Sequence, residues 1–154
     1  MLPEQSEIVR RIVADMKDRP GPLIELLHAV QAALGHVPAD AVPIVAEALN
    51  LSRAEVHGVV TFYHFFRETP PGKHTVHICR AEACQSMGAN GLVAHAKKRL
   101  GVDFHETTAD GVFSLEPVFC LGNCALSPAA MIDDQLYGRV TPERFDQLVA
   151  EKKQ

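Results

Sequence analysis

The sequence lacks any long apolar run, and no stretch reaches the ~18 apolar residues that a membrane-spanning helix needs. It also lacks a basic surplus, because 15 Lys and Arg stand against 19 Asp and Glu and give a formal net charge of −4. Nucleic-acid-binding proteins usually carry such a surplus. We therefore expect neither nucleic acid nor a membrane as a direct partner. No internal repeat or low-complexity segment is present, which excludes a repeat architecture.

A secretory h-region is missing as well, because residues 1–11 carry charges from the first turn on and contain no apolar core. Hydrophobic residues make up 47% of the chain and charged residues 22%, which is typical of a soluble globular protein. We expect a cytoplasmic location. With 154 residues the chain is near the size of one domain, so it can bury a core of its own.

The first 70 residues show helical periodicity and almost no strand pattern. Gly35 is suited to end a helix, because glycine tolerates the left-handed conformation there. Ser52 and Glu55 match a capping box, in which each side chain satisfies a free backbone N–H group of the other residue. Helices are expected over residues 8–16, 23–34 and 38–49 and from residue 52 onward.

The pattern changes around residues 70–72, where two prolines and a glycine follow one another. Short β-branched runs then alternate with helical periodicity, in the order β-α-β-β-β-α, which suits a small α/β sandwich. Strands are expected over residues 75–79, 111–119, 129–132 and 136–140, and helices over 88–100 and from 141 onward. The domain boundary is therefore expected between residues 70 and 71.

Four cysteines form two pairs, Cys79-x4-Cys84 and Cys120-x3-Cys124, and each pair follows an expected strand. A reducing cytoplasm disfavours disulfides, so metal ligation or redox chemistry is the expected use of these thiols. A loop that leaves a strand end can bend back on itself. Two thiolates four or five residues apart can then reach one metal, and loops on neighbouring strands can face each other.

Spacing alone supports two interpretations of the pairs equally, a structural zinc site and a [2Fe–2S] cluster. It gives less support to free or disulfide-paired thiols. A dithiol oxidoreductase is disfavoured because neither pair has C-x-x-C spacing. A Rieske centre is disfavoured because it would leave two cysteines without a role. Gly122, Asn123 and Gly88 favour the cluster, since backbone near them can approach it and offer N–H donors to its sulfurs.

Longer motifs extend along nearly the whole chain and accompany the cysteines. The sequence resembles the thioredoxin-like [2Fe–2S] subunits of respiratory complex I, NAD-reducing hydrogenases and NAD-dependent formate dehydrogenases. His57 departs from the tyrosine that this family commonly has before Gly58. The motifs that carry the resemblance are Leu34–Pro38, Leu51–Val56, Gly58–Tyr63, Pro71–Lys73, the two cysteine pairs, Gly88-Ala89, Glu116–Cys124 and Ser127–Ala129.

The resemblance implies an α/β protein in which an N-terminal helical bundle segment, residues 1–70, precedes a thioredoxin-like [2Fe–2S] ferredoxin domain, residues 71–154. It implies that Cys79 and Cys84 bind one iron and that Cys120 and Cys124 bind the other. The implied activity is one-electron transfer without catalysis by the chain itself. The implied partner is an FMN- and NAD-binding flavoprotein subunit.

Within that family, residues 79–88 look most like the gamma subunit of soluble molybdenum-dependent formate dehydrogenases. This likeness implies a second partner, a large subunit with a molybdenum cofactor and further iron–sulfur clusters. The equivalent subunit of an NAD-reducing hydrogenase or of complex I is the alternative within the family. A zinc-stabilised interaction module and a thiol-based redox sensor are alternatives of other classes.

Two further groups of residues have competing interpretations. His74 and His77 lie close to the first cysteine pair, where they either tune the site or serve the structure, and a structural role is favoured. An aromatic cluster just before the boundary is interpreted as core between the two parts of the chain rather than as an exposed docking patch for the flavoprotein subunit. The cluster consists of Phe62, Tyr63, Phe65 and Phe66.

Overall fold

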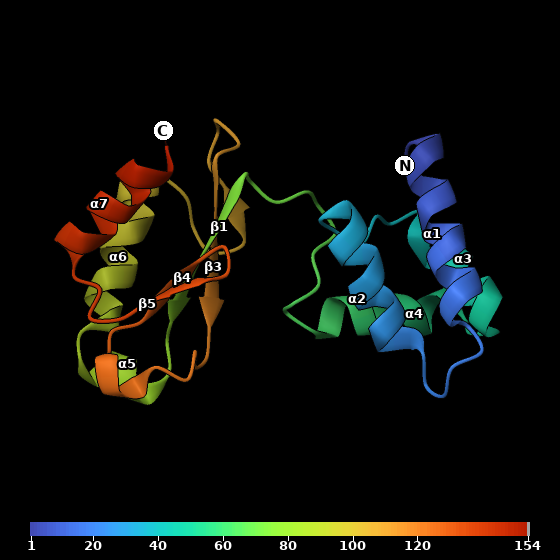
Figure 1. The fold of residues 1–154 in the computed structure, drawn as a ribbon, viewed down its shortest axis with the longest axis horizontal. Coiled ribbons are helices and arrows are strands. Elements are labelled where there is room, and N and C mark those ends of the chain that lie inside the picture. The colour runs from blue at the N-terminus through green and yellow to red at the C-terminus, as the bar shows by residue number, and fades with distance from the viewer. Residues whose placement is uncertain (154) are drawn as a thin grey trace. The chain divides into compact units, whose positions relative to one another are not determined.

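The computed structural model describes residues 1–153, and contacts among them divide the chain into two compact units, Met1–Pro70 and Pro71 onward. Figure 1 shows helices in the first unit and a sheet covered by helices in the second. The chain is therefore α/β, as expected. No helix within residues 1–153 is long and apolar enough to cross a membrane.

The N-terminal unit is built from the helices α1 (Pro3–Met16), α2 (Leu23–Leu34), α3 (Ala41–Leu49) and α4 (Arg53–Phe62). Helix α2 ends at Gly35 with a left-handed φ of 79°, as the glycine predicts. Ser52 and Glu55 form the expected capping box at the start of α4. The buried faces of the helices form one hydrophobic core, with Leu26, Leu27, Val30 and Val45 fully buried.

The second unit contains a mixed five-stranded sheet in the order β2-β3-β1-β4-β5. Its strands are β1 (His74–Cys79), β2 (Glu106–Thr107), β3 (Phe113–Val118), β4 (Ala130–Ile132) and β5 (Gln135–Tyr137). Strands β1 and β3 are parallel, whereas the other neighbouring strands pair antiparallel. A crossover that contains helices joins β1 to β3, as parallel strands require.

Helices α6 (Ala89–Leu100) and α7 (Pro142–Lys152) pack on the sheet and lie side by side (Figure 1). Phe145 and Leu148 of α7 join Leu92 of α6 and the sheet residues Ile78 and Leu115 in a second hydrophobic core. Thr141 caps α7 by accepting a hydrogen bond from the Arg144 N–H group, at 3.2 Å, and Pro142 occupies its first turn.

The structure differs from the expected element order in short segments. Helix α5 (Glu82–Ser86), strand β2 and the 3₁₀ turn η1 (Cys124–Leu126) are absent from the sequence-based expectation, because five residues or fewer show no usable periodicity. The last strand ends at Tyr137 rather than at residue 140, since Arg139 has a φ of 49°, outside the extended region.

Candidate functional site

The parallel pairing of β1 and β3 brings the two cysteine pairs to one edge of the sheet. Cys79, the last residue of β1, lies opposite Val118, the last residue of β3. The Arg80 N–H group donates to the Val118 carbonyl at 2.7 Å, and the Cys79 N–H group donates to the Ala129 carbonyl at 3.0 Å. Because parallel strands end at the same edge, the segments that follow both strands start side by side.

The first cysteine pair is buried. Only 2% of Cys79 and 2% of Cys84 is exposed. The chain turns from β1 into α5, which returns Cys84 toward the sheet edge, where both cysteines pack with Ala89 and Ala129. Small side chains at these two positions leave the sulfurs room beside the backbone.

The second cysteine pair is exposed. The Sγ atoms of Cys120 and Cys124 lie 3.8 Å apart. Cys120 has a φ of 96° and Gly122 a φ of 73°, so the backbone makes a tight turn between the two cysteines. The Gly122 N–H group donates to Cys120 Sγ at 3.3 Å, which is the kind of backbone donor that the glycine predicts. Gly88, by contrast, starts α6 with a left-handed φ and donates its N–H group to the Gln85 carbonyl.

Groups of both cysteine segments act on the pKa of Cys79. Burial raises the pKa of the Cys79 thiol, whereas hydrogen bonds from the Ala81 backbone and the Cys84 thiol lower it. Backbone hydrogen bonds from Cys120 and Leu121, in the other segment, also lower it. The net effect places the pKa of Cys79 below its ordinary value. Donors from both segments thus stabilise a thiolate at this position.

Cys124 shows the opposite effect. Its hydrogen bond with Cys120 raises the pKa of the Cys124 thiol, and repulsion by the charges of Cys120, Cys84 and Cys79 adds to the increase. The charges of the other three cysteines therefore act on Cys124. Four thiolates gathered in this way repel each other, and a bound multivalent cation would offset that repulsion.

Two residues to which the sequence assigns no role of their own hold the second cysteine segment in place. Ser127 is buried and its Oγ donates to the Cys124 carbonyl at 2.7 Å. Gly138 packs closely against the second cysteine segment. A Cβ at this position would be 2.6 Å from Leu126 Cβ and 2.9 Å from Asn123 Nδ2. The pattern of a strand gives no signal for the Gly138 contact, because Gly138 and Leu126 lie on different elements and are distant in the chain.

Exposed apolar side chains surround the cysteine segments. Met87 follows Cys84 by three residues, Phe119 precedes Cys120, and Leu126 closes η1. Their exposed fractions are 62%, 66% and 42%. The edge of the sheet that carries the exposed pair is therefore also apolar.

The histidines near the first pair divide in their contacts. The His74 Nδ1–H group donates a hydrogen bond to the Asp133 carboxylate at 2.9 Å, which ties the start of β1 to the turn between β4 and β5. This contact gives His74 a structural role, the role that its position favours. His77 lies within β1, opposite Glu116 on β3 and Met131 on β4.

The aromatic cluster splits in its burial. Phe66 is buried in the core of the N-terminal unit. Phe62, Tyr63 and Phe65 are 74%, 42% and 62% exposed, so they lie outside the core of the N-terminal unit. The reason is geometric, since α4 ends at Phe62 and the chain beyond it turns only one ring inward. The interpretation of the cluster as core between the two parts stays a prediction. Gln31 holds this segment by hydrogen bonds to the backbone of Phe65 and of Arg67.

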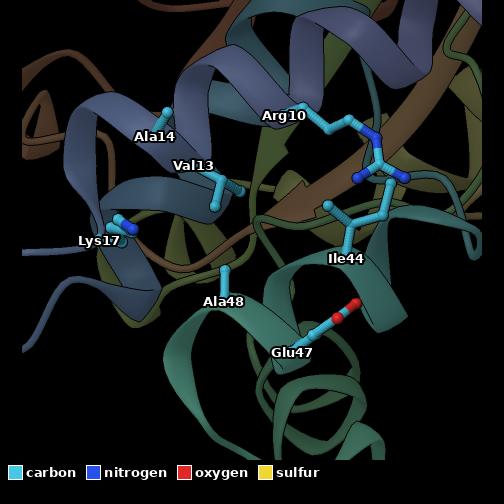
Figure 2. A pocket seen from close by; sticks show the side chains of 7 residues that line it. All are labelled: Arg10, Val13, Ala14, Lys17, Ile44, Glu47 and Ala48. Carbon is cyan, nitrogen blue, oxygen red and sulfur yellow. The ribbon is translucent and has the colours of Figure 1, made fainter.

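A pocket of about 330 Å³ lies between α1 and α3 of the N-terminal unit (Figure 2). Arg10 and Lys17 contribute basic groups to its lining and Glu47 an acidic one, among aliphatic side chains. This mixture of charges points to no particular class of ligand. The cysteine edge has the more distinctive chemistry.

The donor set of that edge fits an iron–sulfur cluster. A [2Fe–2S] cluster takes two thiolates on each iron, and two pairs of thiols lie at or just after the ends of strands that end at this edge. Backbone N–H groups point at Cys79 and Cys120, as they do toward cluster ligands. Among residues 1–153, no three His, Cys, Asp or Glu side chains gather closely enough to hold a single metal ion.

Comparison with solved structures supports the architecture. The chain is similar to a chain of the NAD⁺-reducing [NiFe]-hydrogenase in its H₂-reduced state, with a TM-score of 0.70 and 26% sequence identity. The similarity covers 85% of this chain and 22% of that chain. The chain is thus similar to a small part of that longer hydrogenase chain.

Curated relatives match over most of their length. The NADP-reducing hydrogenase subunit HndA of Solidesulfovibrio fructosivorans is 35% identical over 149 residues, which is 97% of this chain and 86% of HndA. A subunit of the NADH-quinone oxidoreductase of Pseudomonas aeruginosa is 41% identical over 126 residues, 82% of this chain and 76% of that relative. A family model described as thioredoxin-like [2Fe–2S] ferredoxin matches residues 9–153. The chain belongs to the thioredoxin-like [2Fe–2S] ferredoxin family, with the α/β fold and the [2Fe–2S] cluster that this family implies.

Proposed function

We propose that this chain is the one-electron carrier subunit of an NAD-linked oxidoreductase, with its [2Fe–2S] cluster bound by four cysteines. Cys79 and Cys84 bind one iron, and Cys120 and Cys124 bind the other. One observation carries the proposal: parallel β1 and β3 end at the same edge of the sheet, where Ser127 contacts both the Cys84 thiol, at 3.5 Å, and the Cys124 carbonyl, at 2.7 Å.

The bound cluster supplies one-electron redox chemistry. The chain's own residues hold and insulate it. Burial of Cys79 and Cys84 would keep water from one side of the cluster, whereas exposure of Cys120 and Cys124 leaves its other side open to a partner. The backbone donors at Cys79 and Cys120 stabilise negative charge on sulfur and so favour the reduced state.

The proposed redox partner is an FMN- and NAD-binding flavoprotein subunit. The cluster would exchange single electrons with the flavin, which would exchange hydride with NAD and so join one-electron to two-electron chemistry. The names of the relatives support the link to a nicotinamide cofactor, because they are subunits of an NADP-reducing hydrogenase and of an NADH-quinone oxidoreductase. We place the complex in the cytoplasm and treat residues 1–70 and 71–154 as separate domains.

For the substrate of the complex we propose formate, with a large molybdenum-cofactor iron–sulfur subunit as the second partner. The support is the likeness of residues 79–88 to the formate dehydrogenase gamma subunit. Affinity purification of the full chain from its native cells, followed by mass spectrometry, tests both partners. Recovery of a flavoprotein with a hydrogenase or quinone-reductase subunit, in place of a molybdenum protein, would overturn the formate assignment and keep the carrier function.

Metal analysis tests the function itself. The full chain, purified without oxygen, is expected to contain iron and acid-labile sulfide in equal amounts, about two of each per chain. Cys124→Ser is expected to lose or strongly alter the paramagnetic signal of the reduced protein, because a thiolate ligand is removed. Stoichiometric zinc without sulfide would make the chain a zinc-stabilised module instead.

A further inference from the structure

Ser127 lies between the two cysteine pairs and contacts both. Only 6% of the residue is exposed. Its Oγ accepts a hydrogen bond from the Cys84 thiol, with Sγ and Oγ 3.5 Å apart. The same Oγ donates to the Cys124 carbonyl at 2.7 Å. One buried hydroxyl thus bridges a sulfur of the first pair and the backbone of the second.

Metal ligation reverses the hydrogen bond between Cys84 and Ser127. A cysteine binds iron as a thiolate, so Cys84 then has no proton to donate. A serine hydroxyl rotates freely about its C–O bond and can donate to either of two neighbouring acceptors. Oxygen lone pairs facing a buried thiolate would repel it, whereas an O–H group turned toward the sulfur makes a charge-assisted hydrogen bond.

We propose that Ser127 is a positioning residue that sets the reduction potential by donating its O–H group to Cys84 Sγ. The proposal rests on the proposed function and deepens it. Reduction adds one electron, supplied by the reduced flavin of the partner, and neither breaks a covalent bond nor moves the hydroxyl proton off Ser127. The added negative charge strengthens the hydrogen bond at the sulfur, so the hydroxyl makes reduction easier.

The other donors at the site are harder to change. Cys79 and Cys120 receive hydrogen bonds from backbone N–H groups, which a side-chain substitution leaves in place. The hydroxyl of Ser127 belongs to a side chain, so a single substitution removes it. The contribution of this hydroxyl to the reduction potential can therefore be measured separately from that of the backbone donors.

Redox titration followed by electron paramagnetic resonance tests the proposal on the full-length, cluster-loaded chain. Ser127→Ala is expected to have a lower midpoint potential than the wild type, whereas Ser127→Thr keeps the hydroxyl and restores it. Ser86→Ala is the matched control, because Ser86 lies two residues after Cys84 but is exposed and donates to the Ala83 carbonyl. Its potential is expected to be unchanged.

A second measurement detects the proton itself. In D₂O, pulsed paramagnetic resonance of the reduced wild type is expected to show an exchangeable deuteron coupled to the cluster that is missing from Ser127→Ala. Loss of the cluster from Ser127→Ala but not from Ser127→Thr also assigns a role to the hydroxyl.

Two outcomes overturn the proposal. One is a Ser127→Ala protein that keeps its cluster with an unchanged potential and deuteron spectrum. The other is loss of the cluster from both variants, which would mean that the size of serine matters rather than its hydroxyl. Failure of the proposed function is a different result, since the wild type would then contain no iron and sulfide.

Discussion

The four cysteines occupy two different environments, although both pairs have similar spacing and lie at or just after the end of a strand in the sequence. Cys79 and Cys84 are shielded by the sheet and by α5, whereas Cys120 and Cys124 are exposed. Cysteine reactivity depends on both the thiolate fraction and access of the reagent. For the first pair, the lowered pKa of Cys79 would speed alkylation and burial would slow it. We expect burial to determine the rate, because an alkylating reagent must reach the sulfur.

Removal of the metal is expected to expose this asymmetry. In the folded, metal-free protein, iodoacetamide should modify Cys120 and Cys124 quickly and Cys79 and Cys84 slowly. Peptide mass spectrometry at timed intervals measures the four rates. The cluster-loaded protein, with all four thiolates coordinated, is the protected control. Equal rates at the four positions in the folded apoprotein would contradict the buried placement of the first pair.

At the scale of elements, the segment after β5 supports the second cysteine pair. Gly138 packs against Leu126 of η1, and the Arg139 N–H group donates to the Leu126 carbonyl at 2.6 Å. The turn between β4 and β5 supports the start of β1 in a different way. The Asp133 carboxylate contacts His74, the Thr75 N–H group and Lys152.

Gly138→Ala is expected to displace the second cysteine segment. The added Cβ would lie 2.6 Å from Leu126 Cβ, closer than packed carbon atoms approach. Overpacking of this kind costs about 1–3 kcal/mol, and we expect a reduced iron content per chain as η1 shifts. Gly91→Ala is the matched control, because Gly91 lies in α6 with no atom within 4 Å of the new Cβ. Helix propensity predicts a gain of about 0.5–1 kcal/mol there.

Iron content and urea unfolding of the two alanine variants separate a local clash from a general effect of losing glycine. If Gly138→Ala keeps full iron content and wild-type stability, the packing of this segment against Leu126 does not support the site.

Asp133 is expected to make stability depend on pH. Burial raises the pKa of its carboxyl, but hydrogen bonds from His74, the Thr75 backbone and Lys152 outweigh burial and lower it. A carboxyl with a depressed folded-state pKa stabilises the fold above its unfolded pKa of about 3.9, and this stabilisation disappears as the pH falls through the folded-state pKa. Asp133→Asn, which tolerates the local φ of 55°, removes the charge.

We therefore expect Asp133→Asn to be about 1 kcal/mol less stable than the wild type at pH 7 and equally stable near pH 2. Urea unfolding across a pH series measures the difference. Asp134→Asn, at the exposed neighbouring position, is the control. A difference that stays constant with pH would show that the carboxylate acts through its shape rather than its charge.

At the scale of the whole molecule, two hydrophobic cores form within separate units. One core joins α1, α2, α3 and α4, and the other joins the sheet with α6 and α7. Each unit keeps most of its contacts to itself. Units with separate cores can unfold in separate steps, and then no single transition describes the chain.

Unfolding by denaturant is expected to proceed in two steps. Leu27→Ala, in the first core, should move the loss of helix content to lower denaturant concentration. The denaturant concentration at which the cluster absorbance is lost should stay unchanged. Leu115→Ala, in the second core, should move the loss of absorbance to lower denaturant. Both leucines are fully buried, and each change is expected to cost about 2–5 kcal/mol. Coincident shifts of both signals in both variants would show that the chain unfolds as one unit.

Local features that depend on neighbouring residues could be predicted from the sequence. The helix end at Gly35, the capping box of Ser52 and Glu55, and the helix start at Pro142 all rest on contacts within one turn of backbone. The cysteine pairs are equally local, because five residues or fewer separate their members. Helix α5 and strand β2 were missed since propensity is too weak a signal over so few residues.

By itself the sequence determined the spacing of the thiols, the family and the alternation of helices and strands. Only the tertiary structure decided that β3 lies beside β1 and parallel to it, and hence that both cysteine pairs share one edge. It also decided that Ser127 and Gly138 support the site. The reason is physical: hydrogen bonds between strands and close packing join residues distant in the chain, and no local pattern of residue types encodes which distant partners meet.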